Sequence, residues 1–490
     1  MKRIMYYTCL VFLISFIFFE NDSYAQNYND ALRLSDIGLG FNARALGMGN
    51  ASTGLSDDFS AVSLNPAGLA LVKRMEFAGG LDYNKFNNST TFFNNQTDYS
   101  NSATKLDQLS FIFPFPTLRG SFVVAAGYSI DKNFNGALNF DGFNPGNNSM
   151  IKDLALSNDN IPYDLYLSYP LYDAAGNYLK DTTLINGNLN QSGNILSSGS
   201  IGKWSFAGAS EVSKNVYVGI TLNLYNGTYK RTRDYYEDDT KNIYGNDVLT
   251  DQGNASTADF QTFYLNDILD WNISGWDAKV GFIYQLYSSM LMGARIGATI
   301  KFPTTYTIKE DYTVSGESDF KNAVYTINPP LESKIEYDIT TPYVFSGGAS
   351  VNYAGLIVNA DVSYIDYSQM EFSNGLSATE MSSNNTTIKD LFRGVVNYNV
   401  GAEYTIPVVG IRVRGGFILN PSPFQGDPSS YDRKYITGGI GFLANETFAV
   451  DAAYVYGWWD TIGDNYGSNV SRTYQSIKYH NLVFTFSYRF

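Results

Sequence analysis

The sequence predicts an all-β protein, a 14-stranded antiparallel transmembrane β-barrel plugged by a small helical N-terminal hatch. Three observations lead to this fold class. The last segment of the chain alternates strictly between apolar and polar residues, short and long connections follow one another along the chain, and the only long apolar run lies at the N-terminus. A barrel wall with lipid on one side and a polar lumen on the other has these properties.

The final segment, residues 477–490, is the clearest strand. A strand places alternate residues on opposite faces, so one face here is apolar and the other mostly polar. A free chain end frays in water, which makes a soluble sheet a poor match for this ending. A strand that closes a membrane barrel fits better. The apolar set is Leu482, Phe484, Phe486, Tyr488 and Phe490, and the other set is Asn481, Val483, Thr485, Ser487 and Arg489.

Residues 1–25 are predicted to be a secretory signal peptide. Two basic residues precede an apolar run over 5–19, and Ser23-Tyr24-Ala25 fits a cleavage site with small residues. Gln26 would then be the first mature residue. Because Cys9 lies inside the apolar run, the mature chain has no cysteine, and an exported protein without disulfides needs another source of stability, such as a closed barrel.

The composition agrees with an outer-membrane barrel. The chain has 39 Tyr and 33 Phe, enough for aromatic girdles at two membrane interfaces. Its mean hydropathy is slightly negative, at −0.18, as expected when only alternate strand residues face lipid. A net charge of −14 argues against a nucleic-acid partner, because phosphate binding requires clustered Lys and Arg. We therefore expect a location in the bacterial outer membrane.

Residues 26–73 are predicted to form the hatch, or plug. Gly and Ala are dense over 36–50 and 55–70, aromatic residues are sparse, and alternation is absent. Small residues permit close packing, and Asn65-Pro66 interrupts any helix at that point. Short helices and turns are therefore expected.

Residues 74–490 are predicted to form the barrel, with the short connections at one end and the long ones at the other. The largest long loops span about 132–199 and 235–272. The predicted strands lie near 74–86, 104–114, 119–131, 200–212, 215–234, 273–287, 290–308, 332–352, 355–369, 391–406, 409–420, 433–444, 447–459 and 477–490. The long connections lie near 87–103, 132–199, 235–272, 309–331, 370–390, 421–432 and 460–476, and the short turns are at 115–118, 213–214, 288–289, 353–354, 407–408 and 445–446.

Charged residues within the strands are predicted to face the lumen. An Arg or Lys at the lipid midplane costs about 2–4 kcal/mol. The alternation places the charges opposite the apolar set in each strand. The predicted lumenal residues are Lys279, Arg295, Asp361, Glu403, Arg412, Arg414 and Asp451.

Two regions carry a family resemblance. Gly47-Met-Gly-Asn-Ala51, followed by Asp57-Asp58-Phe-Ser-Ala-Val-Ser-Leu-Asn65-Pro66-Ala67-Gly68-Leu69, resembles the hatch signature of the FadL/TodX family of outer-membrane transporters for long-chain fatty acids and other hydrophobic compounds. Ile411-Arg-Val-Arg-Gly-Gly-Phe-Ile-Leu-Asn-Pro421-Ser-Pro423 is similar to the family's strand that runs into a Ser-Pro loop. The resemblance spans nearly the whole mature chain. The hatch-motif residues are Gly47, Gly49, Asn65, Pro66, Ala67 and Gly68.

The resemblance implies passive uptake of a hydrophobic small molecule such as a long-chain fatty acid. The ligand would be caught by the loops, pass the hatch and leave through a lateral gap in the wall. Leu167 and Leu171 lie in an apolar part of the largest loop that could receive ligand or fold over the mouth. The arginines could pair with a carboxylate head group or with acids such as Glu403 and Asp451. The candidate ligand-binding residues are Arg295, Arg412, Arg414, Leu167 and Leu171.

A second function is compatible with the same pattern. PorV-like components of the type IX secretion machinery resemble this chain in hatch and barrel, and they act as scaffolds or shuttles for surface protein secretion. An enzyme is not expected, because the one histidine, His480, lies on the lipid-facing parity. We expect no catalytic residues, metal or cofactor. The expected partners are a hydrophobic ligand, outer-membrane lipid and lipopolysaccharide, and the barrel-assembly machinery, which would recognise Phe490.

Overall fold

The computed structural model describes residues 26–157, 159–245, 255–289, 291–407, 409–444, 447–467 and 469–490. The predicted signal peptide, residues 1–25, lies outside the described residues, as do Val408 and the predicted turn at 445–446. No helix in the described part of the chain is long and apolar enough to cross a membrane.

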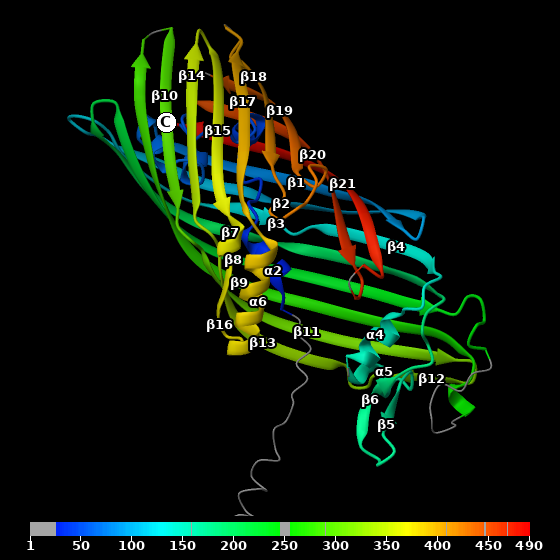
Figure 1. The fold of residues 1–490 in the computed structure, drawn as a ribbon. Coiled ribbons are helices and arrows are strands. Elements are labelled where there is room, and N and C mark those ends of the chain that lie inside the picture. Colours follow the sequence, from blue (N-terminus) through cyan, green and yellow to red (C-terminus); the bar gives the residue numbers. More distant parts are fainter. Residues whose placement is uncertain are drawn as a thin grey trace, which may run out of the picture.

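The wall is a closed, fourteen-stranded antiparallel barrel, as predicted (Figure 1). Closure is made by the terminal strand β21 (Arg472–Arg489), which pairs with β1 (Glu76–Phe92) from Glu76 opposite Arg489 to Thr91 opposite Tyr474. The other wall strands are β2 (Asn95–Phe115), β3 (Phe122–Asn133) with its continuation β4 (Gly136–Asn144), β7 (Leu189–Ser213), β8 (Val216–Asp238), β9 (Phe260–Ser288), β10 (Met292–Lys301) with β11 (Thr305–Phe320), β13 (Leu331–Thr340) with β14 (Val344–Tyr353), β15 (Leu356–Asp366) with β16 (Glu371–Asn374), β17 (Gly394–Thr405), β18 (Ile411–Asn420), β19 (Arg433–Ala444) and β20 (Phe448–Asp464).

The two faces of the terminal strand are those predicted from its alternation. Phe484, Phe486 and Tyr488 are exposed on the outside of the wall. Val483 and Thr485 are buried on the inside. The outward side chains meet lipid in a membrane, so their exposure in the isolated chain is the expected state of a barrel surface.

The hatch region contains four short helices within the barrel. Each begins where an Asn or Asp side chain accepts a backbone N–H at the helix start, a common helix-capping arrangement. The caps are Asn27, Asn42, Asp58 and Asn65. The helices are α2 (Tyr28–Ser35), α3 (Ala43–Gly47), the 3₁₀ helix η1 (Phe59–Val62) and the 3₁₀ helix η2 (Pro66–Leu71).

Several strands are longer than the lengths predicted from the alternation of apolar and polar residues. The predicted long loop at 87–103 is wrong, because β1 and β2 continue through it to a tight turn at Phe93 and Asn94. Strand residues also enter both predicted large loops, leaving connections of 145–188 and 239–259. Strand β9 has 29 residues, whereas about 9–11 cross a membrane. Beyond the lipid, the outward face no longer needs to be apolar, so the lipid-facing part of the period-two signal is lost while the backbone ladder continues.

The extended strands carry a small module formed by residues 145–188. Its helix α4 begins at the carboxylate of Glu237 in β8, which accepts the backbone N–H groups of Met150 and Ile151 at 2.6 and 3.3 Å. This attachment fixes the module to the barrel wall. Its elements are α4 (Met150–Leu156), α5 (Asn160–Asp164), β5 (Tyr169–Tyr172) and β6 (Tyr178–Thr182). Elsewhere the described residues also form η3 (Ala255–Thr257), β12 (Ala323–Thr326), η4 (Tyr367–Gln369) and α6 (Ala378–Leu391).

Helix α2 lies against the inner face of these extended strands, beside α6 (Figure 1). Ala31 and Leu34 of α2 are buried in a cluster that includes Trp271 of β9, Tyr337 of β13 and Ile388 of α6. The N-terminal helix is therefore part of the packed core at the long-loop end of the barrel.

Candidate functional site

A buried ionic network attaches the hatch to the barrel wall. Arg44 of α3 lies with its Nε 3.1 Å from Oε2 of Glu403 in β17. The same oxygen lies 2.7 Å from Nε of Arg414 in β18, whose Nη1 lies 2.7 Å from Oδ1 of Asp451 in β20. The Arg414 side chain is fully buried. Two cations and two carboxylates therefore hold one helix of the hatch against three wall strands.

Within the hatch, Arg44 also pairs with Asp57, with Nη1 2.5 Å from Oδ1. Burial alone would lower the pKa of the Arg44 guanidinium, but Asp57 and Glu403 raise it well above its ordinary value. Burial likewise raises the pKa of the Asp57 carboxyl, and the charge of Arg44 outweighs this and lowers it. Both groups therefore stay charged at neutral pH.

The Asn65 side chain fastens the second half of the hatch. Its Nδ2 donates to the carbonyl of Thr53 at 2.6 Å and to that of Phe282 in β9 at 3.0 Å, while its Oδ1 accepts the N–H of Ala67. The wall accommodates this approach with a glycine. An ideal Cβ at Gly281 would lie 2.1 Å from Asn65 Oδ1, too close for any side chain.

The remaining motif residues also lie where the hatch meets its surroundings. Gly49 has φ +62°, and a Cβ there would lie 2.9 Å from the carbonyl of Val400. A Cβ at Gly68 would lie 1.9 Å from the carbonyl of Ser56. Gly47 packs on Arg414, and Pro66 and Ala67 begin η2, the helix capped by Asn65. The motif thus positions the hatch inside the barrel.

Three cavities succeed one another from the long-loop end to the hatch. The outer cavity, about 370 Å³, and the middle cavity, about 530 Å³, share Asn29, Leu32 and Arg433 in their linings. The middle cavity and the inner cavity, about 180 Å³, share the extended stretch 36–40 and the wall residues Asp131 and Lys132. Asp36 borders all three cavities and forms an ion pair with Arg433. Residues 36–40 are therefore the partition between the middle and inner cavities.

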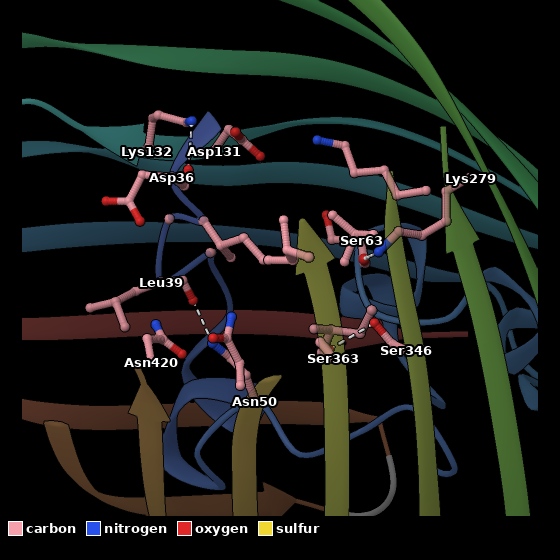
Figure 2. Close-up of a pocket in the computed structure, with 18 of the residues that line it drawn as sticks. Asp36, Leu39, Asn50, Ser63, Asp131, Lys132, Lys279, Ser346, Ser363 and Asn420 are labelled. Atoms are coloured by element: carbon pink, nitrogen blue, oxygen red, sulfur yellow. Dashed lines mark hydrogen bonds between the residues drawn. The ribbon is translucent and has the colours of Figure 1, made fainter. Parts of the chain in front are cut away.

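The inner cavity is rich in lysine. Lys132, Lys203, Lys279 and Lys301 line it, from four different wall strands, together with Asp131 and other polar residues. Figure 2 shows Lys132, Asp131 and Lys279 at this cavity. Lys203 Nζ lies 2.8 Å from Asp131 Oδ1, and Lys301 Nζ lies 3.2 Å from Asp277 Oδ2. These two lysines have carboxylate partners.

The other two lysines bind neutral oxygens of the hatch. Lys132 Nζ donates to the carbonyls of Leu34 and Asp36 at 2.6 and 2.8 Å, and Lys279 Nζ donates to the carbonyl of Ser63. Within the described part of the chain, neither ammonium forms an ion pair. Because a buried cation is costly without a counter-charge, this cavity is suited to an anionic group.

The predicted ligand-binding residues do not come together. Arg414 is held in the hatch network, as one of the two sequence interpretations expected, and Arg412 is half-buried on the same strand. Arg295 lines a separate cavity of about 270 Å³ with Asp57, on the other side of the hatch from the inner cavity. Leu167 is fully buried inside the loop module, and Leu171 lies in β5.

Sequence reasoning missed three of the four cavity lysines. Lys279 was predicted to be lumenal and is. Lys203 and Lys301 lie on the inward parity of their strands, so the same alternation argument could have found both. Lys132 follows a register shift after Ile130 in β3, and an irregularity of that kind cannot be read from alternation.

Together, a hatch-plugged barrel and internal cavities define an outer-membrane transport barrel. The profile of the outer membrane protein transport protein family (OMPP1/FadL/TodX) matches residues 38–489, and the chain belongs to this family. The family is one of transport proteins, and its members lie in the bacterial outer membrane, as this protein does. No curated protein matches the chain.

Solved structures share the fold. The toluene transporter TodX of P. putida is 13% identical, with a TM-score of 0.56, over 92% of this chain and 99% of that one. A FadL homologue of Pseudomonas aeruginosa is 10% identical, with a TM-score of 0.55, over 93% of this chain and 99% of that one. At these identities the likeness concerns the fold.

Proposed function

We propose that this protein is a passive channel for hydrophobic small molecules that carry an anionic head group, such as long-chain fatty acids. The observation that carries the proposal is the inner cavity, where Lys132 and Lys279 have no carboxylate partner among the residues that the structure describes, although the whole chain has a net charge of −14. Local positive charge in an acidic protein attracts and orients an anion. One of the similar solved structures is a toluene transporter, which supports a hydrophobic cargo.

The three cavities supply the path. A ligand that reaches the outer cavity would pass to the middle cavity along their shared lining at Leu32 and Trp459. The partition at 36–40 then separates it from the lysines. This stretch has no regular secondary structure, and its movement needs no external energy if the ligand binds better to the open arrangement. We therefore infer that ligand binding displaces the partition.

We infer a lateral exit beside the bend between β3 and β4. The β2–β3 ladder covers 108–115 and 122–129, and β4 pairs with β7 instead of β2. Side chains link β2 to this region, for example Thr97 Oγ1, which donates to the carbonyl of Asn139 at 2.5 Å. A wall held by side chains opens with fewer broken backbone bonds. The bend residues Asp131 and Lys132 also touch the partition, so displacement of the partition would free this part of the wall.

The experiment is equilibrium binding of a labelled long-chain fatty acid to the refolded barrel in detergent, with the chain beginning at residue 26 or at residue 39. The shorter form lacks α2 and residues 36–38 of the partition. Saturable binding that weakens in the shorter form supports a hatch-gated channel. Absence of binding in both forms, with the barrel shown to be folded, rejects the fatty-acid assignment.

A second candidate function is the scaffold for surface protein secretion. The observation that favours it is the loop module, whose β5–β6 hairpin exposes Tyr172 and Leu179 at 56% and 60%. Exposed apolar side chains at an outer tip suit protein docking. Deletion of 169–182 distinguishes the two functions. If the protein is a scaffold, the deletion abolishes retention of a protein partner. If it is a channel, fatty-acid binding in the inner cavity is unchanged by the deletion.

A further inference from the structure

A second interruption crosses the barrel wall on the side of the inner cavity away from β3. Three neighbouring wall strands break at one level, between β10 and β11 at 302–304, between β13 and β14 at 341–343, and between β15 and β16 at 367–370. We call this line the seam. Between the first two strands the register is the same on both sides of the seam, with Lys301 opposite Val344 and Thr305 opposite Thr340. Pro303 and Pro342 therefore face each other across the two strands. Between the second and third strands the register shifts, from Val344 opposite Ile365 to Thr340 opposite Glu371.

The prolines change how the seam is held together. Proline has no N–H and donates no bond to a ladder, so it is rare inside a sheet. The neighbouring threonines compensate on one side only. Thr341 N donates to the Thr304 carbonyl at 2.9 Å, Thr304 N donates to Thr341 Oγ1 at 2.9 Å, and Thr304 Oγ1 donates to Asp277 Oδ2 at 2.8 Å. The opposite side, at Phe302 and Tyr343, lies outside the paired strands.

The inner face of the seam is part of the inner cavity. Lys301, Thr341, Pro342 and Val344 all line that cavity. On the outer face, the rings of Phe302 and Tyr343 meet edge to face with centroids 6.0 Å apart, and both residues are 41% exposed. A single backbone layer with proline on both strands therefore separates the lysines from the outside of the wall.

The seam lies at the edge of the lipid-facing belt nearest the long loops. On the short-turn side of the seam, β10 presents Ile296 and Ile300 outward. On the long-loop side, the outward residues include ion pairs such as Lys309 with Glu336, across β11 and β13, with side chains 68% and 58% exposed. The aromatic pair at the seam thus occupies the interfacial position where Tyr and Phe gather in membrane barrels.

We propose that the seam is a second lateral portal, through which a hydrophobic ligand passes between the inner cavity and the interfacial region of the outer leaflet. Phe302 and Tyr343 are its outer gate. A ligand whose head group is held at Lys279, the cross-strand neighbour of Lys301, would place its apolar tail between the two rings. Pro303 and Pro342 have no N–H, so neither proline donates a hydrogen bond that must break when the rings separate. The proposal rests on the proposed channel function.

Engineered disulfides can test the portal, because Cys9 is the only cysteine of the chain and lies in the predicted signal peptide. The seam lock is Phe302→Cys with Tyr343→Cys, two positions that face each other as a disulfide requires. The matched control is Phe345→Cys with Tyr364→Cys, an outward aromatic pair in the intact β14–β15 ladder. The exit lock is Thr97→Cys with Asn139→Cys, across the β2–β4 contact. Uptake of radiolabelled oleate into cells is measured for each, oxidised and then reduced.

We expect the oxidised seam lock to lower uptake at least threefold and reduction to restore it, with the control pair unaffected in both states. Unchanged uptake in the oxidised seam lock would reject the portal proposal. An exit lock that alone abolishes all uptake would also reject it, because no ligand would then be passing through the seam. Neither result contradicts the proposed channel function. The channel function is rejected instead if cells that contain the unmodified protein take up no more oleate than cells that lack the protein. If the seam cysteines prevent folding, Phe302→Ala replaces them, with faster uptake expected and unchanged uptake counting against the portal.

Discussion

Arg44 of the hatch and Glu403 of the wall form a buried ion pair, with Nε and Oε2 3.1 Å apart, and Arg414 shares the same carboxylate oxygen at 2.7 Å. A single acidic side chain therefore neutralises a cation of the plug and a cation of the barrel. Removing one partner from such a buried group leaves uncompensated charge and costs about 3–5 kcal/mol. Hatch docking thus depends on Glu403 more than on any exposed pair.

Glu403→Gln should loosen the hatch while the barrel stays closed, because the ladder from β1 to β21 does not involve this side chain. We expect cleavage by added protease within 36–57 to become at least tenfold faster, measured by mass spectrometry of the folded protein in detergent. Glu336→Gln is the control, since its pair with Lys309 is exposed and worth about 0–1 kcal/mol. Equal cleavage rates in both variants would falsify the assigned role of Glu403.

Lys279→Met should weaken binding of a fatty acid about tenfold or more, because a hydrogen bond to a charged group contributes about 1.5–3 kcal/mol. Binding of toluene, which has no charge, should change less than twofold. Lys309→Met, on the outer face, is the matched control and should alter neither. Calorimetry in detergent gives both affinities. A parallel loss for both ligands would show that Lys279 shapes the cavity without binding a head group.

Gly281→Ala should displace the hatch, because the added Cβ would meet Asn65 Oδ1 at 2.1 Å. Loss of the two bonds from Asn65 to Thr53 and Phe282 should follow, and with it a larger passage for ions. We expect several-fold higher single-channel conductance in planar bilayers. Gly208→Ala is the control, since a Cβ there meets nothing within 4 Å. Unaltered conductance in the Gly281 variant would mean that the hatch adjusts without moving.

Phe490 is proposed to be the signal read by the barrel-assembly machinery. Its N–H donates to the Met75 carbonyl at 3.0 Å, and the residue is 53% exposed, so the ring contributes little to packing. Phe490→Ser should therefore reduce the amount of protein in the outer membrane several-fold without lowering the stability of protein refolded in detergent. Tyr474→Ser, an exposed aromatic on the same strand, is the control. Equal loss from both variants would indicate a general effect of aromatic content.

The sequence predicted the wall well where lipid imposes a period of two. In β21 the apolar parity and the inward Val483 and Thr485 follow from alternation alone. The prediction of a loop at 87–103 is wrong because the β1–β2 hairpin there extends past the lipid and its strands are polar on both faces. These parts of the strands do not contact lipid, so nothing requires their residues to alternate between apolar and polar, although the strands continue.

The site was less accessible to sequence reasoning. Lys203 and Lys301 could be placed in the lumen by parity, but their convergence on one cavity depends on which strands are neighbours and at what height. For Arg414, alternation predicted the inward position correctly but not the role of the side chain. Only the contacts with Glu403 and Asp451 show that Arg414 belongs to the ionic network that holds the hatch. The facing prolines 303 and 342 require the register, which alternation leaves open.

Gly38→Val should open the partition between the middle and inner cavities. An ideal Cβ at Gly38 would lie 2.1 Å from the carbonyl oxygen of Asp131, so any side chain pushes the partition away from the wall. The displaced stretch would lose the bonds from Lys132 to Leu34 and Asp36, and the ligand would no longer have to displace it. We expect uptake of labelled oleate to start faster, by about threefold or more.

Two measurements separate this outcome from general damage. Gly208→Val adds the same side chain on the outer face of β7, where an added Cβ meets nothing within 4 Å, and should leave uptake unchanged. Protease cleavage in the Gly38 variant should increase at 36–40 and stay unaltered at the Arg44–Glu403 contact, because the ionic network does not include this stretch. Slower uptake in Gly38→Val with an intact hatch would mean that the partition guides the ligand instead of blocking it.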